Sequence, residues 1–64
     1  QPLKGQQVVI MAEMKAPEDQ PWGVEKGDKW CLVAWVRTQV IPVETYISSF
    51  WVPAEWLDEH GEVA

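Results

Sequence analysis

Apolar residues gather in short runs along this chain, separated by polar segments rich in glycine and proline. The first run, Val8 to Ala12, is short and rich in β-branched residues, and a second run, Trp30 to Val36, is apolar at nearly every position. Short β-branched runs bounded by turn residues are typical of strands, and an uninterrupted apolar run is typical of a strand covered on both faces. We therefore expect a strand in each run.

The segments around the second run predict turns. Residues 15–21 (KAPEDQP) form a loop with two prolines, and the Gly27-Asp28 step suits a tight reversal. Further along, Val40-Ile41 and residues 45–52 both have strand composition. Pro42 lies between them and is excluded from a central ladder position, so it indicates a turn, a bulge or an edge. No Asn-Gly or Asp-Gly step fixes this turn, so its position stays open.

The C-terminal part predicts a short helical turn and a polar tail. Proline is tolerated at the first helical position, and alanine, glutamate and leucine favour helix, so Pro53 to Trp56 predicts one short 3₁₀ turn. We expect the ends, residues 1–6 and 59–64, to be flexible, with the polar tail from residue 58 fraying. The chain is then a single domain, residues 1–64, with its core at residues 8–58.

These elements predict an all-β fold. Short strands and turn-rich joints in 64 residues favour a small antiparallel barrel, because closing the sheet removes its exposed edges. A pair of amphipathic helices is the competing class, but the chain has five prolines and no helical apolar stripe longer than two turns.

Composition and charge restrict the classes of partner and the cellular compartment that we expect. Ten carboxylates face five basic groups, a formal charge of −5, so a nucleic-acid backbone would be repelled and a basic partner, or mimicry of nucleic acid, is easier to accommodate. No apolar run approaches the ~20 residues of a membrane span. The single cysteine excludes an intramolecular disulfide and fits a reducing, cytoplasmic compartment. A start at Gln1 instead of Met suggests a module cut from a longer protein or a processed terminus.

No residue constellation points to catalysis, a metal or a cofactor. A nucleophile and base would have to be Cys31 and His60, but Cys31 lies within the most apolar run and is interpreted as an inert core residue. Asp58, Glu59 and His60 are adjacent donors on a polar tail and do not converge on one ion. We therefore expect a protein that is not an enzyme.

Two motifs resemble those of a Src-homology 3 (SH3) domain. The segment from Trp22 to Asp28 looks like the diverging turn of that family, and the segment from Trp51 to Leu57 looks like its final segment, with Trp56 where a tyrosine is usual. The spacing from Gly27 to Pro53 is what a compact member needs. The resemblance covers roughly residues 8–58, and it implies an SH3-like barrel that recognises a protein or peptide.

The resemblance breaks where the family binds proline peptides. Met14 and Ala16 stand where the groove tyrosines are usual, and an ungapped count puts Val40 and Ile41 at the tryptophan pair. A shorter loop would bring Trp35 to that place instead. We therefore expect a partner to be bound differently from a standard proline peptide.

In the resembling family, acids of the long loop pair with a basic residue of the ligand. Glu18, Asp19 and Glu25 lie at matching positions along this chain.

Five tryptophans are more than a small barrel can enclose. Trp30 and Trp35 are separated by an odd number of positions, so on a regular strand they point to opposite faces, and one of them must lie at a surface or an interface. Exposed indole beside proline and methionine is typical of a protein-contact surface.

Two functions remain open at this point. The first is a non-catalytic interaction module that binds a peptide or protein, proline-containing and basic if the family pattern holds. Its candidate binding residues are Met14, Glu18, Asp19, Glu25, Trp35, Trp51, Pro53 and Trp56. The second is a small acidic protein that associates with itself as a homodimer, or an inhibitor of phage or plasmid type that blocks a basic surface.

Overall fold

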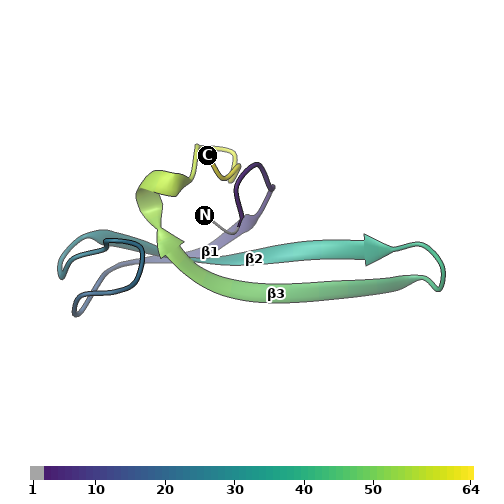
Figure 1. Cartoon of the computed structure of the whole chain (residues 1–64), viewed down its shortest axis with the longest axis horizontal. Helices are drawn as coiled ribbons and strands as arrows, with labels where there is room; N and C mark the ends of the chain where they lie inside the picture. The colour runs from purple at the N-terminus through teal and green to yellow at the C-terminus, as the bar shows by residue number, and fades with distance from the viewer. Residues whose placement is uncertain (1–2) are drawn as a thin grey trace.

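The computed structural model describes residues 3–64 as a three-stranded antiparallel sheet in the order β1-β2-β3. The strands are β1 (Val9–Lys15), β2 (Lys29–Gln39) and β3 (Glu44–Pro53), and a 3₁₀ turn, η1 (Ala54–Trp56), follows β3 directly (Figure 1). The expected all-β class and the short 3₁₀ turn are thus confirmed. Among residues 3–64 the sheet stays open, with β1 and β3 as its edges, so the closed barrel is not observed.

β2 and β3 form a hairpin that extends beyond the rest of the molecule. They pair over ten positions, from Trp30 opposite Pro53 to Gln39 opposite Glu44, whereas β1 pairs with β2 only as far as Ala34. The remainder of the hairpin projects alone and gives the chain its extents of 43 × 18 × 18 Å (Figure 1). We call residues 35–48 the arm, and residues 3–34 and 49–64 the body.

A turn at residues 40–43 closes the arm and includes Pro42. The expected turn at this proline is confirmed, and Val40-Ile41 belongs to the turn although its composition resembles a strand. The Ile41-Pro42 peptide bond is cis. The Gln39 side-chain amide donates to the carbonyl oxygens of Ile41 and Pro42 at 3.2 and 3.3 Å.

The main core lies on one face of the sheet, which we call the inner face. Its buried members come from β2, β3 and both end segments: Leu3, Val8, Cys31, Val33, Val52 and Val63. Trp35, Ala54, Trp56 and Leu57 are partly buried against them. Figure 1 shows η1 and both end segments gathered over the same part of the sheet.

Both end segments pack against the sheet, and the expected flexibility of residues 1–6 and 59–64 stays a prediction. Leu3 and Val63 are 2% and 1% exposed, respectively. The Val63 N–H donates to the Gln6 carbonyl at 2.9 Å, and the Val8 N–H donates to the Gly61 carbonyl at the same distance. Within the polar tail, residues 58–64, only Gly61 and Val63 are buried, and the residues on either side of each are exposed. Residues 1 and 2 of the expected flexible end lie outside the described residues.

The opposite, outer face is covered only at one end. There the loop between β1 and β2 folds over Trp30 and forms a second small cluster of Ala16, Val24 and Trp30. β2 is thus covered on both faces near this end, as its unbroken apolar run predicts, but Val36 is 48% exposed. No helix within residues 3–64 is long and apolar enough to cross a membrane.

Candidate protein-binding surface

The outer face carries no charged side chain. Residues directly opposite each other in neighbouring strands share a face, so the register defines this surface. Its rows, from the covered end to the arm, are Met14, Trp30 and Pro53; Ala12, Leu32 and Trp51; Val9, Ala34 and Ser49; Val36 and Ile47; and Thr38 and Thr45.

Large apolar side chains of the outer face are open to solvent. Val9 is 58% exposed, Ile47 68% and Trp51 38%. A sheet with one solvated face normally alternates apolar and polar residues along each strand. This face is apolar or hydroxyl-bearing throughout its length, which is typical of a surface that contacts another molecule.

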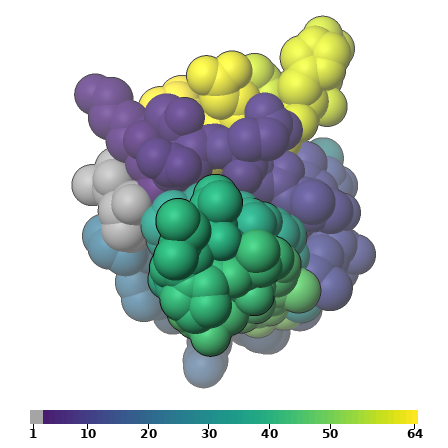
Figure 2. Space-filling view, turned by 90° about the vertical axis from the view of Figure 1, so that its right-hand side faces the viewer, coloured from purple at the N-terminus to yellow at the C-terminus, as the bar shows by residue number. Residues whose placement is uncertain are grey.

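The tip of the arm extends the apolar surface. Val40, Ile41 and Val43 are 74%, 88% and 78% exposed. Figure 2 looks along the arm toward the body, with the tip facing the viewer below the two end segments.

The inner face of the arm is polar. Arg37 donates to the Ser48 hydroxyl at 2.6 Å, and its guanidinium lies 4.2 Å from the centre of the Trp35 ring. The Tyr46 hydroxyl donates to the Glu44 carboxylate, and this hydrogen bond raises the pKa of Tyr46. The arm is therefore amphipathic, with its hydrogen bonds on one face and its apolar side chains on the other.

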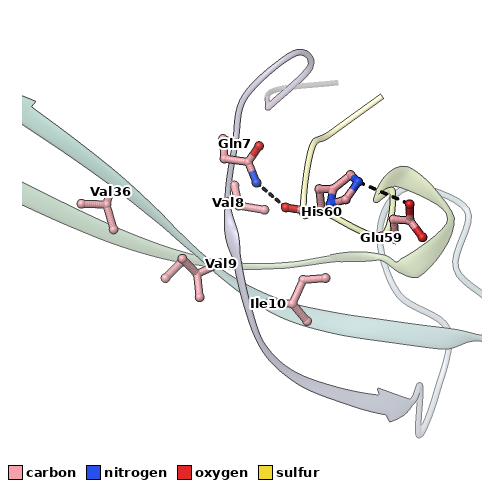
Figure 3. Close-up of a pocket in the computed structure, with 9 residues that line it drawn as sticks. Gln7, Val8, Val9, Ile10, Val36, Glu59 and His60 are labelled. Carbon is pink, nitrogen blue, oxygen red and sulfur yellow. Dashed lines mark hydrogen bonds and ion pairs between the residues drawn. The ribbon is translucent and has the colours of Figure 1, made fainter.

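A groove of about 540 Å³ lies where the arm meets the body. Nine residues line it: Gln7, Val8, Val9, Ile10, Ala34, Val36, Glu59, His60 and Gly61. Figure 3 shows Val36 and Val9 on one side of Val8, and Glu59 and His60 on the other. The Gln7 side-chain amide donates to the His60 carbonyl and joins the two end segments there. The groove thus combines an apolar lining with a polar rim.

The predicted binding residues do not form one patch. Met14 and Trp51 lie on the outer face next to Trp30, whose ring stacks on Trp51 with centres 6.0 Å apart. Pro53 belongs to the same end of this face but is buried.

The other two predicted aromatic residues, Trp35 and Trp56, pack partly buried against the inner core. Trp56 also contacts Trp22, at 5.3 Å between ring centres. Trp30 and Trp35 point to opposite faces, as their spacing predicts. Trp30 is buried under the β1–β2 loop, and Trp35 is partly buried against the inner core.

The predicted acidic residues all lie in the β1–β2 loop and are exposed. The Asp19 carboxylate accepts a hydrogen bond from the Lys26 N–H at 3.0 Å, so it stabilises the turn before β2. The Glu25 N–H donates to the Asp28 carboxylate at 2.9 Å in the same turn. Glu18 and Glu25 extend the acidic edge of the loop, which packs on Trp30 through Val24.

Sequence reasoning missed the arm. Val36, Ile41, Val43 and Ile47 were not candidates, because a compact barrel leaves no room for a projecting hairpin. One signal could have shown it: between residues 30 and 54 the chain carries only two charges, on Arg37 and Glu44. A long uncharged hairpin with a proline turn is hard to place inside a small closed sheet.

The two candidate reactive side chains, Cys31 and His60, lie in different environments. Cys31 is 1% exposed, and burial, together with the nearby Glu13 carboxylate, raises the pKa of its thiol, which makes it a poor nucleophile. His60 is exposed and lies 3.3 Å from the Glu59 carboxylate. Within residues 3–64, no three histidine, cysteine or acidic side chains gather as metal ligands.

In comparisons with protein-family models, curated proteins and solved structures, nothing matches this chain.

Proposed function

We propose that this chain is a non-catalytic protein-interaction module whose contact surface is the outer face together with the tip of the arm. The observation that carries the proposal is an outer face without charged side chains, apolar or hydroxyl-bearing from Met14 to Thr38 and followed by an apolar tip, on a chain with a formal charge of −5. Most of its large side chains are more than one third exposed. Exposure of such a surface costs free energy, and a partner that covers it recovers that cost.

The acidic β1–β2 loop indicates that one end of the proposed partner carries a basic residue. The loop packs on Trp30, so Glu18 and Glu25 border the outer face where Met14 and Trp51 are exposed. The proposed partner therefore offers an apolar strip followed by a basic residue. A solvated charge pair of this kind adds about 0–1 kcal/mol and is screened by salt, so the apolar strip supplies most of the affinity.

We also propose that the module is a divergent relative of the SH3-like barrels. The order of elements supports this: a strand, a long acidic loop, a Gly-Asp turn, two strands joined as a hairpin, and a 3₁₀ turn after a proline. The turn is made by the Asp28 N–H, which donates to the Glu25 carbonyl at 2.9 Å, with Gly27 at φ 92°. The open sheet and the long arm separate the chain from a compact member of that class.

Site-specific photo-crosslinking tests the proposed surface. Benzoylphenylalanine at Ile47, on the outer face, should give a discrete adduct in an extract of the source cells. The same probe at Tyr46, one position along β3 on the inner face of the arm, should give much less. Equal adducts from both positions, or adducts from Tyr46 alone, would show that the outer face is not the contact surface.

A further inference from the structure

The tip and the groove have complementary shapes and chemistry. The tip is a convex apolar turn with Ile41 88% exposed, and the groove is a hollow of about 540 Å³ lined by Val8, Val9, Ile10 and Val36. Val36 and Val9 also belong to the outer face, so the groove and this face form one continuous surface. The chain therefore carries both an apolar projection and a hollow with an apolar lining.

We propose that the partner of this surface is a second copy of the chain, bound with the two arms antiparallel and each tip in the groove of the other copy. This inference rests on the proposed function, because it names the occupant of the arm end of that surface. The tip of each copy reaches residues 34–36 of the other, and the end bordered by the acidic loop lies outside this contact. A two-fold axis near Thr38 and Thr45 relates the copies, so the contact is the same on both.

The spacing along the arm agrees with this arrangement. Val36, in the groove, and Ile41, at the tip, are five positions apart in the sequence: β2 continues for roughly 10 Å from Val36 to Gln39, and the turn then carries the chain to Ile41. Thr38 lies midway between them. When two arms run antiparallel about that point, the tip of each comes opposite residues 34–36 of the other.

Charge favours this arrangement over other ways of pairing two acidic chains. Nine of the ten carboxylates and four of the five basic groups lie in the body, so the body carries the whole formal charge of −5 and the arm none. Antiparallel arms place the two bodies at opposite ends of the assembly. Their separation then exceeds the Debye length of about 10 Å at 0.1 M salt, and repulsion between the copies is largely screened.

The surface area that the two arms can bury limits the affinity of the proposed dimer. A two-stranded ribbon about 10 Å wide and about 25 Å long buries on the order of 500 Å² of solvent-accessible surface per copy, because protruding side chains add to its flat area. The total of roughly 1,000 Å² is the lower limit for a specific interface. We therefore expect a reversible dimer with a dissociation constant on the order of micromolar.

Sedimentation equilibrium from micromolar to millimolar chain tests the dimer. The unaltered chain should pass from monomer to dimer across this range, with little change when salt is raised. Ile41→Asp should weaken association about 30-fold or more, because a charge would enter an apolar groove. Met11→Asp is the matched control: Met11 is 58% exposed on β1 outside both the tip and the groove lining, so association should be unchanged. If Ile41→Asp fails to fold, Val43→Asp takes its place.

A mixing experiment tests the seating of the tip. Val9→Lys places a cation in the groove, and this variant should associate weakly by itself. Mixed with Ile41→Asp it should form a heterodimer, because the new carboxylate of one copy then meets the new ammonium of the other. A mixture that stays monomeric would overturn the tip-in-groove contact, as would a dimer of Ile41→Asp as strong as the original.

The two proposals fail separately. A chain that remains monomeric at every concentration would exclude the second copy as partner. If benzoylphenylalanine at Ile47 then still gives an adduct to another protein, the outer face keeps its function as a contact surface for a different occupant. If neither dimer nor adduct is found, both proposals are wrong.

Discussion

Gly61 holds the C-terminal turn against the start of the chain. Its φ is +80°, a conformation that L side chains rarely adopt, and a Cβ there would lie 2.4 Å from the Val8 carbonyl oxygen. That oxygen belongs to the segment whose N–H groups also bond the turn. The position therefore requires glycine for both its backbone conformation and its space.

Gly61→Ala should destabilise the chain by at least about 2 kcal/mol, since the left-handed conformation alone costs about 1–2 kcal/mol and the clash adds to it. Gly5→Ala is the control, because Gly5 has φ +78° and nothing within 4 Å of the added Cβ. It should cost only the conformational part. Urea unfolding compares the two, and equal losses would show that contact with Val8 contributes nothing.

Asp58 organises the same turn by electrostatics. Its carboxylate accepts from the Glu62 N–H at 2.9 Å and the His60 N–H at 2.8 Å, and these bonds lower its pKa from the ordinary value of 3.8. Because the pKa of Asp58 is lower in the folded chain, the ionised carboxylate stabilises the fold at pH values above its pKa in the unfolded chain. That contribution is lost as pH falls through the folded pKa.

Asp58→Asn should therefore reduce stability at neutral pH, and the difference from the unaltered chain should disappear as pH falls below about 3.8. Asparagine keeps an acceptor oxygen in the turn but removes the charge. Thermal unfolding across the acid range measures this. A difference that stays constant with pH would assign the effect to shape and not to ionisation.

At the scale of elements, the hairpin divides into a part that packs and a part that projects. Cys31, Val33 and Val52 anchor the body half of β2 and β3 in the main core. Beyond Ala34 the hairpin has no third strand, and its inner face is held by the contacts of Arg37 with Trp35 and Ser48. Apart from Trp35, which packs against the main core, the arm therefore contributes little to the stability of the body.

Replacing residues 37–46 by Asn-Gly tests this division. The dipeptide suits a two-residue hairpin turn between Val36 and Ile47, which are opposite each other in the sheet. The shortened chain should fold, with a free energy of unfolding within about 1 kcal/mol of the full chain, because surface changes away from the core cost little. NMR amide spectra and urea unfolding check this. Loss of the folded body would show that the arm is part of the folding unit.

At the scale of the molecule, local sequence signals predicted individual strands and the 3₁₀ turn, but not how these elements pack against one another. The apolar runs at Val8 and Trp30 predicted β1 and β2, and Pro53 predicted the 3₁₀ turn, because each depends on neighbouring residues. Pro42 left a turn, a bulge or an edge open, and the position of the hairpin turn was not predicted. The packing of Leu3 against Val63 was not predictable in this way. It depends on contacts between opposite ends of the chain, which no local pattern records.

The predicted binding residues lie on different faces of the sheet, and this too depends on contacts between segments that are distant in the sequence. Met14 and Trp56 match groove positions of the resembling SH3 family, but here the register puts Met14 on the outer face, and Trp56 packs against the inner core. The register is a property of paired strands and cannot be read from either strand alone. The contact surface that we propose is therefore the outer face and the arm instead of the expected groove.

The central claim is that a second copy of the chain covers the tip and the outer face of the arm while the inner face of the arm stays in water. Methyl relaxation caused by a soluble paramagnetic probe measures this directly, in dilute and in concentrated samples of the unaltered chain. We predict that the methyl groups of Val36, Ile41 and Ile47 lose contact with the probe on concentration, while the Tyr46 ring keeps it. Undiminished relaxation of those methyl groups, or protection of Tyr46 in their place, would contradict the account.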